Sequence, residues 1–178
     1  MTPARTASTS RSRRPARRLA AVAVLLIGAA LAIGGFEAAG DRPTRVTVSV
    51  VKNGVEVSLV VSADRVSVTY RPQRPGFHLY SIALPVGGVD GLGVPTRLAV
   101  RGGLRPVGPP ASDQPIRMLK PQGLDVLLPV YPDGPVTITL PVARTAPASA
   151  QIVVSYGACS INTCLVPVAD LAIPVHMD

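Results

Sequence analysis

The amino-acid sequence predicts an all-β domain, a sandwich or a barrel, preceded by an N-terminal apolar helix. Short runs rich in β-branched residues recur along residues 41–178, and Pro, Gly, Asp or Asn bounds each run. No run shows a 3.6-residue apolar period long enough for a helix. Many short strands separated by turn signals are typical of a sandwich or barrel, and residues 41–178 suffice for one such domain.

The first two predicted strands form the clearest hairpin. Thr44–Lys52 and Val55–Ser62 are both rich in β-branched side chains, and Asn53-Gly54 separates them. Two such runs joined by Asn-Gly are the strongest short-range signal for a hairpin. In the second run, apolar residues alternate with Glu and Ser, which indicates a strand with one buried face.

Further runs continue the series of predicted strands. Val66–Tyr70 alternates in the same way, and Pro75-Gly76 provides a turn before His78–Leu84. The remaining predicted strands are Leu98–Arg101, Leu124–Tyr131, Val136–Val142, Ala150–Tyr156, Cys164–Val168 and Leu171–Val175.

The segment Arg101–Pro115 breaks this series. It holds four prolines and three glycines, and proline has no N–H to donate inside a sheet. We therefore predict a long surface loop there, of a kind that is often functional or disordered.

Residues 1–40 are predicted to be an export signal or a membrane anchor. A basic stretch precedes Leu19–Phe36, an uncharged apolar run of 18 residues, as in the n- and h-regions of a signal peptide. Small residues at 38–40 permit cleavage after Gly40, and an uncleaved run is almost long enough to span a bilayer. The alternative is a buried helix behind a basic tail. The positive-inside rule keeps the arginines in the cytoplasm, so residues 41–178 are expected to be periplasmic or otherwise extracytoplasmic, secreted or anchored.

Charge and composition argue against several classes of function. The formal net charge is +8, but six arginines lie in the first 18 residues, and residues 41–178 carry only +3. With two Phe, four Tyr and no Trp, a base-stacking surface for nucleic acid is not expected. Two Cys and two His are too few for a zinc module of the usual kind but suffice for one disulfide or redox pair.

Both cysteines lie in the segment Val154–Pro167. If Ile161-Asn162 is the two-residue loop of a hairpin, Cys159 faces Cys164, and directly opposed residues have Cβ atoms about 4.5–5.5 Å apart. A relaxed disulfide needs about 3.5–4.5 Å. The bond can therefore form with modest adjustment, near the tip of the hairpin.

Three uses of this pair are open at this point. A structural staple is the commonest use of two cysteines in an exported protein, although a ring this small gains only about 2 kcal/mol. Thiol–disulfide exchange is the second, because exposed disulfides are the more reducible ones. The third is a copper or zinc carrier, although the histidines have no ligand spacing of their own. Its potential ligands are Cys159, Cys164, His78, His176, Met118 and Met177.

Three motifs, in chain order, resemble a known family. They are Gly76-Phe77-His78-Leu79-Tyr80, Gly93-Val94-Pro95-Thr96, and Tyr156-Gly157-Ala158-Cys159 followed by Cys164 and Pro167. Together they resemble the N-terminal, extracytoplasmic domain of the thiol:disulfide interchange protein DsbD, over about residues 45–175. The resemblance implies an immunoglobulin-like β-sandwich with the cysteine pair on a hairpin at one end.

The same resemblance implies an electron relay that uses no cofactor. A separate membrane or thioredoxin-like donor would reduce the pair, which would then reduce oxidised extracytoplasmic proteins. Cys159 would form the mixed disulfides and Cys164 would resolve them, with His78, Tyr80 and Tyr156 as accessory residues. The main alternative is a non-catalytic exported module that binds a protein partner and uses the disulfide as a staple.

The sequence departs from the family pattern in several places. Leu165-Val166-Pro167-Val168 replaces the usual Pro-Pro after the second cysteine. The stretch that corresponds to an aromatic cap loop in the family, about Val107–Lys120, has no aromatic residue. Shielding of the disulfide is therefore expected to be weaker, or to use Met118 or Leu119. The membrane conduit and the thioredoxin-like domain of the family are not in this sequence, so a separate electron donor is expected.

Overall fold

The computed structural model describes residues 45–177, and these residues form strands, turns and loops without a helix. No membrane-spanning helix occurs in this part of the chain. The predicted signal or anchor, residues 1–40, lies outside the described residues, so the predicted domain boundary at residue 40 stays a prediction.

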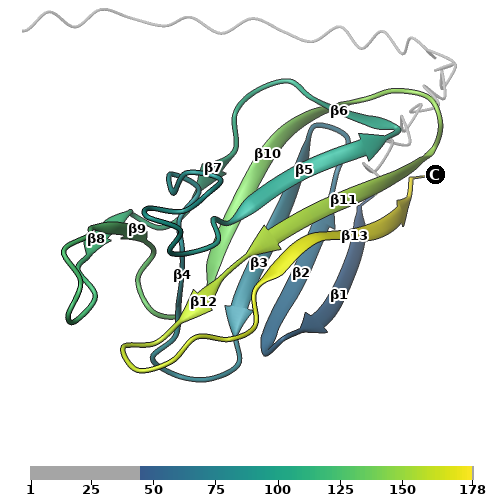
Figure 1. Ribbon diagram of the computed structural model, residues 1–178. Helices are drawn as coiled ribbons and strands as arrows, with labels where there is room; N and C mark the ends of the chain where they lie inside the picture. The colour runs from purple at the N-terminus through teal and green to yellow at the C-terminus, as the bar shows by residue number, and fades with distance from the viewer. Residues whose placement is uncertain (1–44, 178) are drawn as a thin grey trace, which may run out of the picture. The chain divides into compact units, whose positions relative to one another are not determined.

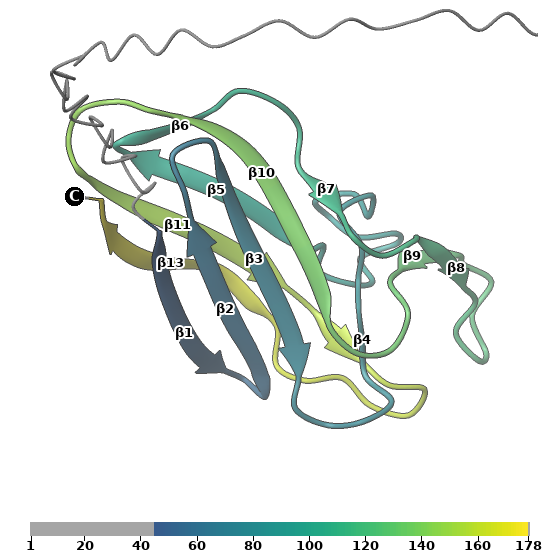
Figure 2. The same cartoon turned by 180° about the vertical axis from the view of Figure 1, so that it is seen from behind.

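Two sheets lie face to face (Figures 1 and 2). The six-stranded sheet runs in the order β1-β2-β3-β10-β6, with β7 also paired to β10, and the three-stranded sheet runs β13-β11-β5. The strands of the first sheet are β1 (Val46–Lys52), β2 (Val55–Val61), β3 (Arg65–Pro72), β6 (Leu104–Pro106), β7 (Ala111–Ser112) and β10 (Val136–Arg144). Those of the second are β5 (Arg97–Gly102), β11 (Ser149–Tyr156) and β13 (Val168–His176).

The core lies between the sheets and follows from the alternation of apolar residues. In β2, the inward-facing Val55, Val57 and Leu59 are fully buried. In β11, Ile152 and Val154 belong to the same apolar cluster from the opposite side. Burying a side chain of this size contributes about 1.5–3 kcal/mol. Because a slip of one residue would turn these side chains to solvent, the burial fixes the register of both sheets.

The predicted Asn-Gly hairpin is confirmed. Asn53 and Gly54 have φ of 49° and 78°, as a two-residue turn of the primed type requires. The Asn53 side-chain amide also donates to the carbonyl of Val166 at 3.1 Å and to that of Pro167 at 3.4 Å. The β1–β2 turn is therefore bound to the segment that follows the second cysteine.

Two short ribbons lie beside the end of the sandwich where β11 finishes (Figure 1). In one, β4 (His78–Leu79) pairs with β12 (Ala158–Cys159). In the other, β8 (Arg117–Leu119) pairs with β9 (Leu128–Val130). An isolated bridge between Tyr80 and Val130 joins the two ribbons.

The predicted strand His78–Leu84 is wrong beyond its first two residues. The Ser81 hydroxyl accepts the N–H of Ala83, and the Ser81 carbonyl accepts the N–H of Leu84. These bonds close a turn, and a serine that binds nearby main chain competes with strand pairing in this way.

The predicted strand Leu124–Tyr131 is likewise shorter, since only Leu128–Val130 pairs. The N–H of Leu124 donates to the carbonyl of Pro121, and Gly123 has a φ of 79°. Leu124 therefore closes a turn instead of starting a strand.

The predicted strand Cys164–Val168 does not form. The N–H of Leu165 donates to the carbonyl of Ala158, and Pro167 has no N–H to offer a ladder. Regular pairing begins only at Val168, the first residue of β13.

The predicted surface loop Arg101–Pro115 needs a correction as well, because it contains part of β5 and the short strands β6 and β7. Both β6 and β7 pair with β10. Pro106 is the last residue of β6, and proline is tolerated on an edge strand of this kind.

Candidate functional site

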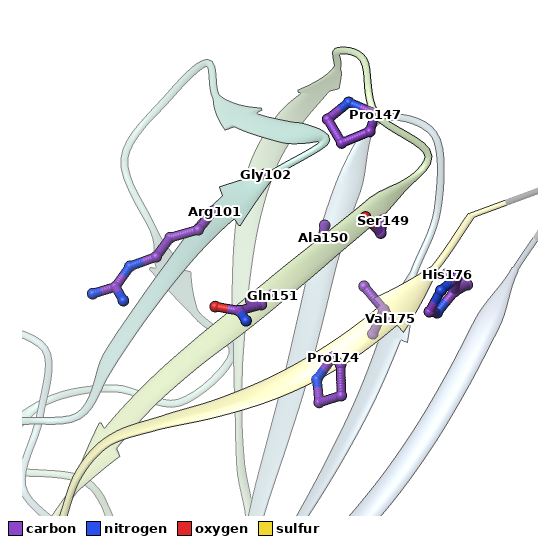
Figure 3. A pocket seen from close by; sticks show the side chains of 9 residues that line it. All are labelled: Arg101, Gly102, Pro147, Ser149, Ala150, Gln151, Pro174, Val175 and His176. Carbon is purple, nitrogen blue, oxygen red and sulfur yellow. The ribbon is translucent and has the colours of Figure 1, made fainter.

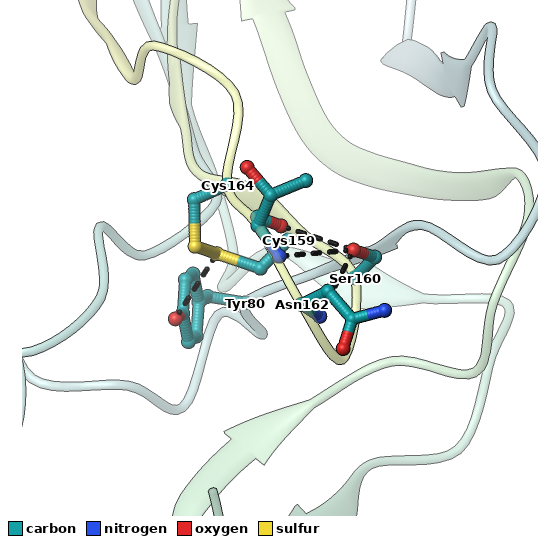
Figure 4. The surroundings of a disulfide bond; sticks show 6 residues. Tyr80, Cys159, Ser160, Asn162 and Cys164 are labelled. Atoms are coloured by element: carbon teal, nitrogen blue, oxygen red, sulfur yellow. Dashed lines mark hydrogen bonds between the residues drawn. A yellow bond between two sulfur atoms is a disulfide. The ribbon is translucent and has the colours of Figure 1, made fainter.

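Cys159 and Cys164 form a disulfide on a tight hairpin (Figure 4). The two residues are bridged antiparallel, and the N–H of Ser160 donates to the carbonyl of Thr163 at 2.7 Å. The loop is thus Ile161-Asn162, which confirms the predicted geometry. The Ser160 hydroxyl accepts hydrogen bonds from the N–H groups of both Asn162 and Thr163, and these two bonds stabilise the loop.

The two sulfur-bearing residues differ in exposure. Cys159 is 5% exposed and belongs to a small apolar cluster with Tyr80, Leu128 and Val130, whereas Cys164 is exposed. An incoming thiolate or disulfide therefore meets Cys164 first. The resemblance implied that Cys159 forms the mixed disulfides, and its burial argues for the opposite assignment.

Tyr80 contacts the buried sulfur. Its hydroxyl lies 3.3 Å from Cys159 Sγ, and it must be the donor because a disulfide sulfur carries no proton. Burial raises the pKa of Tyr80, which keeps the hydroxyl protonated. This residue, predicted as accessory, does lie at the disulfide.

Two glycines make room for the Tyr80 ring. A Cβ on Gly93 would lie 2.9 Å from Tyr80 Cε1, and a Cβ on Gly157 would lie 3.1 Å from Tyr80 Cδ2. Gly157 is also fixed by its N–H, which donates to the Val94 carbonyl. The glycines of two motifs therefore serve to place the tyrosine of the third.

His78 also lies beside the disulfide, as predicted. It is the register partner of Cys159 and is 2% exposed. Its Nδ1 lies 3.4 Å from Oδ1 of Asp133, which also accepts a bond of 2.9 Å from Arg117. Burial lowers the pKa of His78, against an opposing effect of the Asp133 carboxylate. The imidazole is therefore neutral near pH 7.

Tyr156, the third predicted accessory residue, is not at the disulfide. Its hydroxyl donates to the Lys52 carbonyl at 3.0 Å, and its ring packs edge-on against Tyr70 with centroids 5.4 Å apart. Burial raises the pKa of Tyr156 to about 12. Tyr156 is thus a residue of the main core.

Of the six possible metal ligands, only His78 and the two cysteines lie together, and the cysteines are bonded to each other. His176 pairs with Ser149 at the end of the sheet remote from the disulfide, Met177 is buried in the main core, and Met118 is exposed on β8. Among residues 45–177, no group of three or more His, Cys, Asp or Glu side chains could hold a metal ion.

Two cavities flank the disulfide, and both cysteines and Tyr80 line each of them. The larger, of about 540 Å³, also involves His78 and the loop between β8 and β9. The smaller, of about 240 Å³, opens on the side of Leu165 and Pro167. Leu119 lines the larger cavity. Of the two residues expected to shield the disulfide, Leu119 lies at the site and Met118 does not.

A third hollow, of about 330 Å³, lies at the opposite end of the three-stranded sheet (Figure 3). Its polar lining residues are all exposed, and they are Arg101, Ser149, Gln151 and His176. They come from three neighbouring strands and form a surface depression. Neither cysteine contributes to it, so it is separate from the candidate redox site.

The sequence did not reveal Asp133 and Arg117 as parts of the site. Asp133 stands in a Pro-Asp-Gly stretch that is typical of an ordinary turn. Arg117 lies in β8, which the sequence did not predict as a strand. The two meet only because β8 pairs with β9, and no local spacing signals that pairing.

Comparison with solved structures shows a similarity of fold. No family model matches the chain, and no curated protein matches it in sequence. The fold is similar to the crystal structure of the Neisseria meningitidis DsbD N-terminal domain in the reduced form. The two share 18% identity over 70% of this chain and 91% of that chain, with a TM-score of 0.46.

Proposed function

We propose that this protein is an extracytoplasmic thiol–disulfide exchange domain, and that its Cys159–Cys164 pair passes electrons to oxidised protein partners. The observation that carries the proposal is the unequal burial of the two cysteines at the tip of one hairpin. Cys164 is exposed to an incoming partner, and Cys159, which is bonded to it, is buried. Exchange at the first cysteine followed by resolution by the second requires such an arrangement.

The position of the bond is poorly suited to a staple. It joins residues five apart that the hairpin already holds together. Closing so small a loop stabilises the fold by only about 2 kcal/mol. A staple between distant segments would do more, so stability alone gives little reason for a disulfide here.

The reaction proceeds in two exchanges. The Cys164 thiolate attacks a disulfide of the partner, a bond forms between Cys164 and one partner sulfur, and the other partner sulfur leaves as a thiolate. Cys159 then attacks Cys164 Sγ, the mixed disulfide breaks, and the second partner sulfur leaves. Two electrons pass from the cysteine pair to the partner, and the Cys159–Cys164 bond is restored.

Tyr80 assists through the sulfur of Cys159. A hydroxyl that donates to sulfur holds a thiolate more strongly than a disulfide, because a charged acceptor forms the stronger bond. The Tyr80 hydroxyl, 3.3 Å from Cys159 Sγ, therefore stabilises the thiolate that forms when the reduced, buried cysteine loses its proton.

We propose that a separate dithiol protein is the electron donor. A membrane-embedded or thioredoxin-like dithiol would reduce the pair by the reverse of the same two exchanges. We place the domain outside the cytoplasm on the pattern of residues 1–40, either secreted or anchored through residues 19–36. We also infer that the sandwich is of the immunoglobulin-like class, on the resemblance of the three motifs.

Trapping of a mixed disulfide tests the proposal and the order of the cysteines together. The variant Cys159→Ser keeps the exposed nucleophile and lacks the resolving thiol, so it should accumulate covalent complexes with exported proteins. Cys164→Ser is the matched control and should trap far less, because its remaining cysteine is buried. Equal trapping by both variants would contradict the assigned order.

The reduction potential separates exchange from the binding-module alternative. Structural disulfides in secreted proteins have potentials below about −300 mV, whereas exchanging pairs lie above that value. A potential well below it, together with no trapping by Cys159→Ser, would establish the disulfide as a staple in a non-catalytic module.

A further inference from the structure

His78 carries a buried nitrogen with no partner. Among the buried side-chain nitrogen and oxygen atoms of residues 45–177, Nε2 of His78 lacks any hydrogen bond. A buried polar atom without a partner costs folding free energy, and native proteins keep few of them, often at catalytic sites. This atom therefore calls for a functional explanation.

The position of His78 connects that nitrogen with the redox pair. His78 and Cys159 are directly opposed in the β4–β12 ribbon, so their side chains lie on the same face, with Cβ atoms about 4.5–5.5 Å apart. Both residues also line the 540 Å³ cavity, together with Cys164. The imidazole thus shares one cavity with both sulfurs.

Asp133 determines which imidazole nitrogen carries the proton. Its Oδ1 lies 3.4 Å from Nδ1 of His78, the side on which a carboxylate favours an N–H, and Arg117 lies 2.9 Å from the same oxygen. A neutral imidazole has one N–H and one lone pair. With the proton on Nδ1, the lone pair is on Nε2, the atom without a partner.

We propose that His78 Nε2 accepts the thiol proton of Cys159 when this cysteine resolves a mixed disulfide held on Cys164. The inference rests on the proposed function and names a proton acceptor for it. The Cys159 S–H bond breaks, its proton passes to Nε2, and the sulfur attacks Cys164 Sγ. The bond between Cys164 and the partner breaks, and the partner sulfur leaves as a thiolate. The imidazolium is stabilised by Asp133 and later returns the proton to solvent or to the departing thiolate.

The other ionisable groups near the cavity are not suited to this role. Burial raises the pKa of Tyr80, so its hydroxyl stays protonated and cannot take up the thiol proton. Lys120 lines the cavity but pairs with Asp125 at 2.7 Å. The Asp133 carboxylate is engaged by Arg117 and His78.

Resolution of a small mixed disulfide on the full chain tests the proposal. Reduced protein is treated with the aromatic disulfide of 5-thio-2-nitrobenzoate, which places one thionitrobenzoate on Cys164, and release of the second thionitrobenzoate reports the attack by Cys159. His78→Gln should slow this second step by about a hundredfold at neutral pH, as removal of a general base does. The first step, at Cys164, should change little. The wild-type rate should level off above the pKa of His78, whereas the rate of the variant should keep rising with pH.

Equal second-step rates and equal pH profiles in wild type and His78→Gln would overturn the proposal. If His78→Gln does not fold, Asp133→Asn replaces it, because Asp133 is half exposed and its loss should slow the same step less severely. Imidazole nitrogen NMR of the oxidised wild type gives an independent reading, and a proton found on Nε2 would also overturn the proposal. The reagent is a small disulfide, so these outcomes do not depend on whether a protein partner is ever trapped.

Discussion

At the scale of residues, the position of Tyr80 depends on two glycines that lie in other motifs. Gly93 and Gly157 lie against the two sides of its ring, and only the absence of Cβ atoms lets the hydroxyl reach Cys159. Gly157, two residues before Cys159, is therefore needed so that the Tyr80 ring can pack. The hydroxyl that contacts the sulfur belongs to Tyr80, which lies in another motif.

Gly157→Ala should displace the Tyr80 ring and destabilise the protein. The new Cβ would lie 3.1 Å from both Tyr80 Cδ2 and the Val94 carbonyl oxygen, and overpacking of this kind typically costs about 1–3 kcal/mol. Urea unfolding measures the loss. Gly87→Ala is the control, since nothing lies within 4 Å of its Cβ. Equal stability of both variants would show that Val94 and Tyr80 adjust without cost.

Tyr80→Phe should make the disulfide harder to reduce. Loss of the hydroxyl removes a donor to the Cys159 thiolate, worth about 1.5 kcal/mol, and the reduction potential should fall by up to about 30 mV. Equilibration with a glutathione buffer measures it. Tyr156→Phe loses a hydroxyl bonded to the Lys52 carbonyl in the core, so it should lower stability and leave the potential unchanged.

Because His78 is buried, we expect the protein to lose stability in acid. Burial lowers its pKa below the ordinary value of 6.5, so the unfolded chain binds the proton more readily than the folded one. The free energy of unfolding is then undiminished above pH 6.5 and falls as the pH drops below it. Urea midpoints from neutral pH downwards should show the fall, and His78→Gln should lack this part of it. His176→Gln changes an exposed histidine and should retain it.

At the scale of elements, the alternation of apolar and polar residues predicted the long strands of the two sheets. It did not predict the limits and pairing of the short strands in the two ribbons. The strand Ala150–Tyr156 was expected and found, and its inward face of Ile152, Val154 and Tyr156 is buried. That same alternation could have placed Tyr156 in the core. Strand β8 was missed because three residues carry no usable period, and its pairing depends on a turn at residues 121–124.

The β1–β2 turn supports the cysteine hairpin from the other sheet. Asn53→Gly keeps the positive φ of the turn but loses two bonds, to the carbonyls of Val166 and Pro167. We expect a loss of about 1 kcal/mol and faster reduction of the disulfide by a small thiol. Asn53→Asp tolerates the same φ but brings a carboxylate to two carbonyl oxygens, so it should lose more. An unchanged reduction rate in both variants would show that this contact does not restrain the hairpin.

At the scale of the whole molecule, the disulfide lies outside the main core. The core cluster is built from both sheets, while Cys159 belongs to a smaller cluster with Tyr80, Leu84, Leu128 and Val130. Strand and turn signals alone predicted a sandwich or a barrel, and the family resemblance favoured the sandwich. The pairing of the two small ribbons, and hence the surroundings of the cysteines, could not, because contacts between segments far apart in the sequence create them.

The reduced protein should therefore stay folded. Removing both sulfurs, with Cys159→Ser and Cys164→Ser together, should lower the free energy of unfolding by about 2 kcal/mol and leave a single cooperative transition in urea. Loss of that transition would mean that the disulfide is needed for folding, and would favour the structural staple.

The direction of the first strand has a consequence for how the domain can be held. β1 begins at Val46, at the end of the sandwich where the chain turns from Val61 of β2 to Val66 of β3. It finishes at Lys52, and the next residue, Asn53, is bonded to Val166 in the segment after the second cysteine. At about 3.3 Å per residue, these two ends are roughly 20 Å apart. A domain immobilised through residue 45 on a sensor surface thus presents its sulfurs at the outer end, where a soluble partner can dock without steric hindrance from the support.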